Sequence, residues 1–215
     1  MLRRSAVLLT IVSLSACASP ETHRLKETTR PTYDTNTGRL KELTYDGNSN
    51  GRIDTWTDLD GTRALRSRID RDEDGKIDRW EYYDETGKLV KVGFSRRDDG
   101  KPDAWAFSGA DGRISLIEIS SVADETKIDR REYYDVSLAG PDGHGALVRA
   151  EEDTNRDGRP DKWETYENGA VKTVAFDENS DGTPDRRLTY ARSSLRLIES
   201  GPDASGRFAS RVEVK

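Results

Sequence analysis

The sequence predicts an all-β protein built from tandem β-hairpin repeats of about 24 residues, forming an elongated or curled antiparallel meander. An Asp-rich loop of the form Asp-x-Asn/Asp-x-Asn/Asp-Gly-x-x-Asp recurs along the chain. Between the loops, Trp80-Glu-Tyr-Tyr-Asp84 and similar segments alternate with the period of two that is typical of strands. We therefore expect the repeat domain over residues 33–215, after a signal peptide and a flexible tether.

The loops set the period of the array. Aligned on the glycine in their sixth position, the copies have Gly51, Gly75, Gly100, Thr126, Gly158, Gly182 and Gly206. All four tryptophans occupy one slot, two residues after the ninth loop position: Trp56, Trp80, Trp105 and Trp163. Each slot opens a strand, a glycine turn follows, and a second strand returns to the next loop. Seven such units predict about 14 short strands.

Residues 1–16 have the pattern of a signal peptide. Arg3 and Arg4 precede an apolar stretch, residues 6–14, that is too short to span a bilayer. Leu14-Ser15-Ala16-Cys17 resembles a bacterial lipobox, which implies cleavage before Cys17 and acylation of that residue. The alternative is an ordinary secretory signal with an incidental cysteine.

The lipoprotein resemblance implies a location for the protein. Several acyl chains on Cys17 would anchor it stably to a membrane. Ala18, rather than Asp, resembles the pattern that permits export to the outer membrane of a Gram-negative bacterium. Residues 17–32 are polar and without periodicity, so we expect a flexible tether.

The composition limits both the partners and the core. The formal net charge is −6 and no basic patch is present, which argues against nucleic acid as a partner and suits cations. Leu, Ile, Val and Phe make up about 19% of the residues, close to the range in which chains become disordered. A thick two-layer core is not expected, and bound ions could supply the missing stability.

Four loops retain the full pattern of oxygen-bearing side chains. Oxygen ligands at positions 1, 3, 5 and 9, with a sharp glycine turn at 6, suit Ca²⁺. The predicted ligands are Asp46, Asn48, Asn50, Asp54, Asp70, Asp72, Asp74, Asp78, Asp153, Asn155, Asp157, Asp161, Asp177, Asn179, Asp181 and Asp185. The copies at residues 95–103 and 121–129 have lost ligands at position 3, to Arg97 and Ala123, and are expected to bind no ion.

Two of the loops resemble complete EF-hand loops. In these copies Glu81 and Glu164 stand at position 12, where the resemblance implies a bidentate calcium ligand. A strand starting at the tryptophan slot could instead turn both residues toward solvent. The flanking sequences depart from the family because a glycine turn follows where a helix is needed, and because Pro102, Pro160 and Pro184 occupy position 8.

The loops are also similar to the short calcium loops of dockerins and thrombospondin type 3 repeats. The Tyr-Asp-x-x-Gly-x-Leu segments between them resemble bacterial YD repeats. Taken together, the pattern resembles repeat-bearing lipoproteins of Gram-negative bacteria. The alternative is that the Asn-Gly and Asp-Gly steps only form hairpin turns, in which Asp accepts local N–H groups and binds no metal.

The sequence contains no recognisable catalytic constellation. Only His23 and His144 could serve a histidine-dependent site, and no phosphate loop, dinucleotide fingerprint or zinc spacing occurs. We expect a non-enzymatic, lipid-anchored scaffold or interaction module of the cell envelope, with an envelope protein or a polysaccharide as possible partner. A calcium sensor or buffer of EF-hand type and an envelope hydrolase remain as alternatives.

The long turn at residues 136–147 is either a tolerated insertion or a recognition loop.

Overall fold

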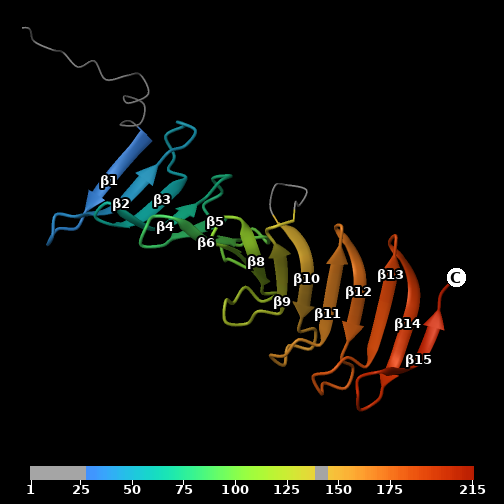
Figure 1. Cartoon of the computed structure of the whole chain (residues 1–215). Coiled ribbons are helices and arrows are strands. Elements are labelled where there is room, and N and C mark those ends of the chain that lie inside the picture. Colours follow the sequence, from blue (N-terminus) through green and yellow to red (C-terminus); the bar gives the residue numbers. More distant parts are fainter. Residues whose placement is uncertain (1–27, 139–144) are drawn as a thin grey trace, which may run out of the picture.

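The computed structural model describes residues 28–138 and 145–215. These residues form one open antiparallel sheet in which each strand pairs with its neighbours in the sequence (Figure 1), so the predicted all-β meander is confirmed. The 15 strands are β1 (Thr29–Tyr33), β2 (Leu40–Tyr45), β3 (Thr55–Asp60), β4 (Arg63–Ile69), β5 (Arg79–Tyr83), β6 (Leu89–Phe94), β7 (Ala104–Ser108), β8 (Ile114–Ile119), β9 (Arg130–Asp135), β10 (Ala146–Glu152), β11 (Lys162–Glu167), β12 (Ala170–Phe176), β13 (Arg186–Ala191), β14 (Ser194–Pro202) and β15 (Phe208–Glu213).

The sheet begins earlier than the sequence indicates. Strand β1 lies largely within residues 17–32, the range expected to be a tether, and brings the total to 15 strands rather than about 14. Its pairing with β2 continues into the first loop, where the N–H of Asp46 donates to the carbonyl of Thr28 at 3.0 Å. The polar segment Thr29–Tyr33 has little apolar periodicity because it lies at a sheet edge and its side chains are mostly exposed.

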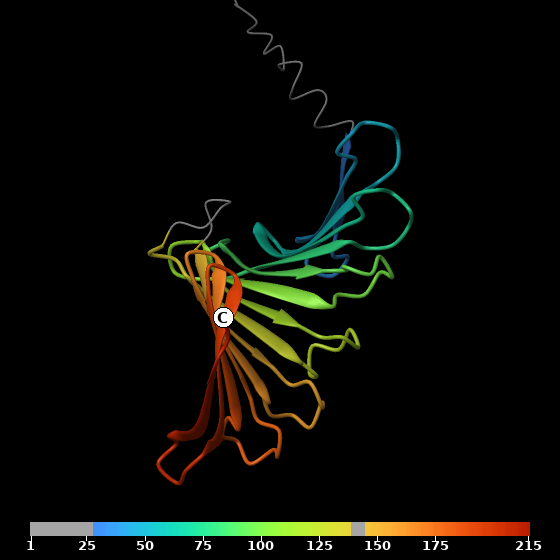
Figure 2. The ribbon, with the colours of Figure 1, turned by 90° about the vertical axis from the view of Figure 1, so that its right-hand side faces the viewer.

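The two kinds of connection alternate along the chain and differ in geometry. Seven strand pairs, from β1–β2 to β13–β14, have a register shift near their connection, which is a tight turn in six of them and a longer segment between β9 and β10. The six strand pairs joined at the Asp-rich loops have none, and neither has β14–β15, which is closed by a short turn at residues 203–207. Because a bulge increases the local right-handed twist, one bulge in every repeat makes the sheet coil, as the fanned strands in Figure 2 show.

One row of paired residues crosses the sheet and contains every tryptophan. Trp80 and Trp105 lie two strands apart in it, with Gly93 between them. Trp105 is 1% exposed and Trp80 is 8% exposed. The row is Thr44, Trp56, Arg68, Trp80, Gly93, Trp105, Glu118, Arg131, Glu151, Trp163, Ala175, Arg187, Glu199 and Arg211. We call the side of the sheet that carries this row the tryptophan face, because paired residues point to the same side.

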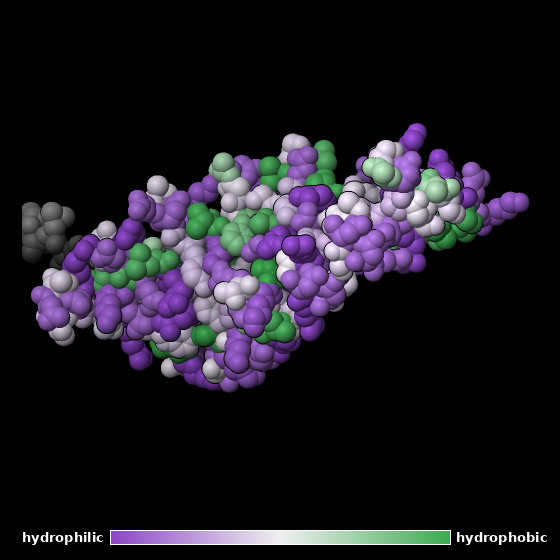
Figure 3. All heavy atoms as spheres, turned by 90° about the horizontal axis from the view of Figure 1, so that it is seen from below, coloured by the Kyte–Doolittle hydropathy of each residue, from purple (hydrophilic) through white to green (hydrophobic). Residues whose placement is uncertain are grey.

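The core is thin, as the composition predicts. The buried apolar residues on the other side of the sheet centre on Val92, Ala106, Ala150 and Val174. The view in Figure 3 shows a mostly hydrophilic surface with small separate apolar patches. No helix within the described ranges is long and apolar enough to cross a membrane.

Replacing Gly93 by valine is expected to lower the free energy of unfolding by about 2 kcal/mol, since overpacking of a filled site costs on that order. A Cβ at this position would lie 3.3 Å from Cβ of Pro102 and 3.5 Å from atoms of both Trp80 and Trp105. Denaturant unfolding measures the change. Ser210→Val, at an exposed position of β15, is the control and should alter stability by less than about 0.5 kcal/mol. Equal effects of the two substitutions would contradict the packing assigned to Gly93.

Candidate metal loops

The Asp-rich loops share one backbone conformation. Position 4 has a positive φ even though it is not glycine, with values of 63° at Ser49 and 61° at Glu73, Arg156 and Ser180. Position 6 is a glycine with φ of 90° or 93° in the same four loops. The two left-handed residues turn the chain so that successive N–H groups point into the loop.

The loops stack in a column along one side of the sheet. The N–H of each first loop residue donates to the carbonyl of the last residue of the preceding loop. The bonds, of 2.8–2.9 Å, run from Asp70 to Asp54, Ser95 to Asp78, Ser120 to Asp103, Asp153 to Asp129 and Asp177 to Asp161. Each loop therefore lies directly against its neighbours in the column.

This register corrects one sequence alignment. Ser120, not Ser121, occupies the first position of its loop, and Ala123, with φ of 54°, occupies position 4. The N–H of Asp124 donates to Oγ of Ser120 at 3.1 Å, as position 5 does to position 1 elsewhere. The loop at 120–129 is thus one residue longer than the others. The sequence alignment missed this because it was anchored on the sixth-position glycine, which this copy lacks.

In loop 177–185 the ligand side chains accept hydrogen bonds from the loop itself. Asp177 accepts from the N–H groups of Asp181 and Gly182 at 3.2 and 2.7 Å. Asn179 and Asp181 accept from N–H groups two residues further on, both at 2.8 Å, and Asp185 accepts from Glu178 at 2.7 Å. The same pattern holds in loop 153–161, with Asp153, Asn155, Asp157 and Asp161.

Loop 70–78 leaves one carboxylate oxygen free. Asp70 is 4% exposed; its Oδ2 accepts from the N–H of Gly75 at 2.9 Å, whereas its buried Oδ1 has no hydrogen-bond partner. Ligand atoms of Asp70, Asp72 and Asp78 all lie within 4.8 Å of one another. A buried, unpaired carboxylate oxygen beside two further carboxylates is costly unless a cation joins them. This loop is the strongest candidate for a metal site.

A second acidic group joins loop 70–78 to the next loop. Asp72 and Asp74 lie within the same 4.8 Å limit of Asp98, which occupies position 4 of loop 95–103. Lys76 contacts both loops, through Oδ2 of Asp74 at 2.7 Å and the carbonyl of Asp98 at 2.9 Å. The hydrogen bond to Lys76 lowers the pKa of the Asp74 carboxyl. No other group of three acidic side chains in the described residues is as close.

Loop 46–54 is closed by a side chain of its neighbour. The side-chain amide oxygens of Asn48 and Asn50 accept hydrogen bonds from N–H groups of the loop. Their amide nitrogens donate to the carboxylate of Glu73 at 2.5–2.8 Å. These bonds, from Asn50 and then Asn48, lower the pKa of Glu73. At the base of the loop, Asp46 accepts from the N–H of Gly51 at 2.7 Å and Asp54 from that of Gly47 at 2.7 Å.

Loop 95–103 contains a built-in cation. Arg97, at position 3, places Nε 3.4 Å from Oδ2 of Asp103 and 3.8 Å from Oδ2 of Asp99. Arg96 adds a contact of 3.2 Å to Oδ1 of Asp103, which is 1% exposed. The guanidinium groups neutralise the acids that remain after serine has replaced the first-position Asp. The sequence pattern identifies Arg97 only as a lost ligand and gives no signal for the contacts that Glu73 makes to the neighbouring loop.

Glu81 and Glu164 belong to strands rather than to the metal loops. Glu81 accepts from Arg79 at 2.7 Å and from the hydroxyl of Tyr83 at 2.6 Å, both on β5. Glu164, on β11, contacts Arg130 and Lys162, each at 2.9 Å. The strand pleat turns both residues to the face opposite the tryptophans. Every described Asp-rich loop connects two strands, so the helix–loop–helix arrangement of an EF-hand is not formed.

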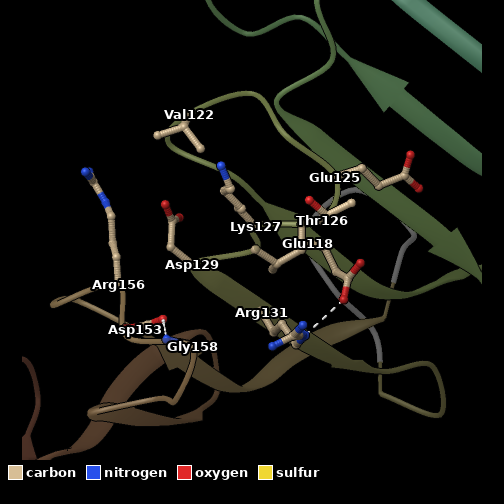
Figure 4. Close-up of a pocket in the computed structure, with 11 residues that line it drawn as sticks. Glu118, Val122, Glu125, Thr126, Lys127, Asp129, Arg131, Asp153, Arg156 and Gly158 are labelled. Carbon is tan, nitrogen blue, oxygen red and sulfur yellow. Dashed lines mark hydrogen bonds and ion pairs between the residues drawn. The ribbon is translucent and has the colours of Figure 1, made fainter.

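A hollow of about 460 Å³ lies where the tryptophan row is interrupted (Figure 4). Arg131 occupies the tryptophan slot there and pairs with Glu118 at 2.9 Å. Lys127 and Asp129 from loop 120–129 and Arg156 from the next loop line the opening.

Comparisons with known proteins place the chain in no family. No family and no curated protein matches it. Several solved structures share limited similarity, including the following three. TarM of S. aureus has TM-score 0.35 and 15% identity over 46% of this chain and 21% of TarM. The accessory secretory protein 1,2 and 3 structure from Streptococcus pneumoniae has TM-score 0.28 and 18% identity over 60% of this chain and 20% of that chain. A porin-like protein from Bacteroides uniformis has TM-score 0.17 and 12% identity over 81% and 53%. The chain therefore spans about a fifth of TarM.

The pH dependence of stability is expected to reflect Glu164. Burial raises the pKa of its carboxyl, but hydrogen bonds from Lys162, Tyr166 and Arg130 outweigh this effect and lower the pKa from 4.5 to about 2. The stabilisation is therefore present above pH 4.5 and is lost as the pH falls toward 2. Between pH 4.5 and 2 the free energy of unfolding should therefore fall by about 1 kcal/mol less in Glu164→Gln than in the wild type, with solvent screening taken into account. Denaturant unfolding at a series of pH values measures this difference.

The control for this prediction is Glu167→Gln on the same strand. The Glu167 side chain is 61% exposed, and its one ion pair among the described residues is with Lys172, at 3.2 Å. Its substitution should leave the acid limb of the stability profile unchanged. If Glu164→Gln also leaves the pH dependence of stability below pH 4.5 unchanged, carboxyl groups other than Glu164 govern acid unfolding.

Proposed function

We propose that this protein is a lipid-anchored repeat scaffold of the cell envelope whose Asp-rich loops bind Ca²⁺ as a structural ion. The observation that carries the proposal is the buried, unpaired Oδ1 of Asp70 beside Asp72 and Asp78. The oxygen-only donor set fits a hard cation, and the loop N–H groups occupy one oxygen of Asp70 while the other stays available.

The charge distribution along the column supports the same conclusion. Where acids have been lost, Arg97 supplies a positive charge within 4 Å of the remaining carboxylates. Loop 70–78 retains four Asp side chains, and in the described residues Lys76 is the one cation bonded to any of them, through Asp74. A bound cation would also reduce repulsion between Asp72, Asp74 and Asp98, which belong to two loops. Ion binding in one loop would therefore hold two repeats together.

A structural role is favoured over a sensor. A sensor needs an element that moves on binding, whereas here strands continue on both sides of each loop and bond to their neighbours. At ~1 mM calcium and a dissociation constant of ~0.1 mM, one site would add ~1.4 kcal/mol to stability. The envelope location rests on the lipobox at Cys17, which lies outside the described residues.

Calcium should raise the melting temperature of the protein, and Asp72→Asn should reduce that response. Oδ1 of Asp72 accepts the N–H of Asp74 at 3.2 Å, and an Asn oxygen keeps this bond while removing one charge. In chelator the variant should therefore be more stable than the wild type by about 0.5 kcal/mol, because like charges repel. In ~5 mM calcium it should be less stable than the wild type, as followed by circular dichroism.

Asp99→Asn in loop 95–103 is the matched control. Oδ1 of Asp99 accepts the N–H of Lys101 at 3.0 Å, and Arg97 lies close to the same carboxylate. This substitution should leave the calcium response at its wild-type size. A wild-type melt that is identical in chelator and calcium would reduce the loops to hydrogen-bonded turns.

The anchor is tested by labelling. Wild-type protein produced in a Gram-negative host should incorporate labelled palmitate, and Cys17→Ala should not, because Cys17 is the only cysteine of the chain. Labelling of both proteins would place the lipid elsewhere, and labelling of neither would favour an ordinary secretory signal.

A further inference from the structure

The two end strands of the sheet differ at their outer edges. In β1 the bond between Asp46 and Thr28 fixes which residues face β2, so Pro31 points its nitrogen outward. Proline has no N–H, and its position on the outer edge obstructs the addition of another strand. The β1 edge is thus protected by its sequence.

The outer edge of β15 has no such protection. The N–H of Val214 donates to the carbonyl of Arg196 at 2.8 Å, so the even-numbered residues of β15 bond to β14. Arg211 and Glu213 consequently direct their N–H and carbonyl groups outward, where no described strand meets them. Residues 209–213 are all exposed.

We propose that β15 pairs with β15 of a second copy of this chain, antiparallel and about a two-fold axis at Val212. In this register Arg211 lies opposite the partner's Glu213, and Glu213 lies opposite the partner's Arg211. Val212 lies opposite itself in a close, non-hydrogen-bonded pair. The triplet Arg211-Val212-Glu213 is therefore self-complementary in charge and shape.

Among the registers within two residues of this one, only this one satisfies the charges; a slide by four would pair Glu213 with the partner's Lys215, which lies beyond the end of β15, and would leave most of the strand unpaired. Sliding the partner by two residues in either direction places two Arg211 or two Glu213 side chains directly opposite each other, and like charges in that position are destabilising. A slide by one residue would place outward groups against groups already bonded to β14. The edge therefore selects one arrangement.

The pairing also continues two rows of the sheet. On the tryptophan face, Arg187, Glu199 and Arg211 alternate in charge, and the partner's Glu213 would come next. Arg211 is 65% exposed and lies 3.3 Å from Glu199, a residue already bonded to Arg187 at 2.7 Å, so it retains capacity for a second acid.

On the opposite face an apolar row reaches the edge uncovered. It runs from Val174 through Leu188 and Ile198 to Val212, which is 54% exposed. The partner's Val212 would cover this end and continue the row into the second copy. Because one strand edge buries less area than a standard interface, the dimer is weak and reversible.

Disulfide trapping tests the pairing. We would use the full chain with Cys17→Ser and one added cysteine, incubated at tens of micromolar under mild oxidation. Val212→Cys should give a covalent dimer, because Cα atoms of a non-hydrogen-bonded pair lie ~4.5 Å apart, within disulfide reach. Ser210→Cys, which would lie opposite residue 214, is the background control. Arg211→Cys tests the neighbouring register.

Charge reversal tests the specificity. Glu213 forms no ion pair within the described part of the chain, and Glu213→Arg in the Val212→Cys protein should lower the dimer yield about tenfold, because it creates two like-charge pairs. Adding Arg211→Glu should restore the yield. Thermal melts of each variant, in chelator and in calcium, show whether the sheet is intact independently of metal binding.

Yields from Val212→Cys no higher than from Ser210→Cys would overturn the proposal. A dimer from Arg211→Cys instead would overturn the register, and a disulfide formed only between Val212→Cys and Thr32→Cys proteins would show a head-to-tail filament. The result expected is a dimer that requires residue 212, is lost on one charge reversal and returns on the second.

Discussion

The fold depends on buried side-chain oxygens at the base of each Asp-rich loop. Asp46, Asp70, Asp153 and Asp177 are 4–8% exposed, and each accepts the N–H of the glycine five residues later. A buried carboxylate without such donors would be prohibitively costly, so the loop must adopt the turn that presents them. That turn requires left-handed residues at positions 4 and 6, which explains the fixed glycine. The strands are then held in register by the bonds between consecutive loops.

A single-layer sheet has no second layer to cover its apolar side chains, and this constrains the repeat. Trp80 and Trp105, the most buried tryptophans, lie on either side of Gly93 in their row, where the missing side chain leaves room for both indoles. The bulge near the turn of each of the first seven hairpins adds twist, while the strand pairs at the Asp-rich loops remain in regular register. Coiling therefore follows from an asymmetry between the two ends of each hairpin, and both ends are encoded in the same 24 residues.

The period of the loops and the alternation of the strands were sufficient to predict the fold class, because both are local patterns. The contacts of Glu73 and Arg97 were not predictable, since they depend on how the side chains are oriented in three dimensions. Glu73 bonds to Asn48 of the adjacent loop, and Arg97 bonds to Asp103 of its own loop. Glu81 and Glu164 match position 12 of an EF-hand loop in the sequence and so resemble ligands. Each directly follows a tryptophan on a β-strand, however, and the alternation of the strand turns its side chain to the face opposite the tryptophan face. The shift of one residue at Ser120 was hidden by the absence of a glycine in that loop.

The loops differ in how their charge is balanced, and this limits where an ion can matter. Glu73 closes loop 46–54 and Arg97 neutralises loop 95–103, so both are complete with protein groups alone. Loop 70–78 lies between them and keeps an unpaired buried oxygen. Since each loop bonds to its neighbours, a cation there would tie together two segments that are already formed. Calcium dependence should then be concentrated around β4–β7 rather than spread evenly over the array, because elsewhere the loop hydrogen bonds already satisfy the acids.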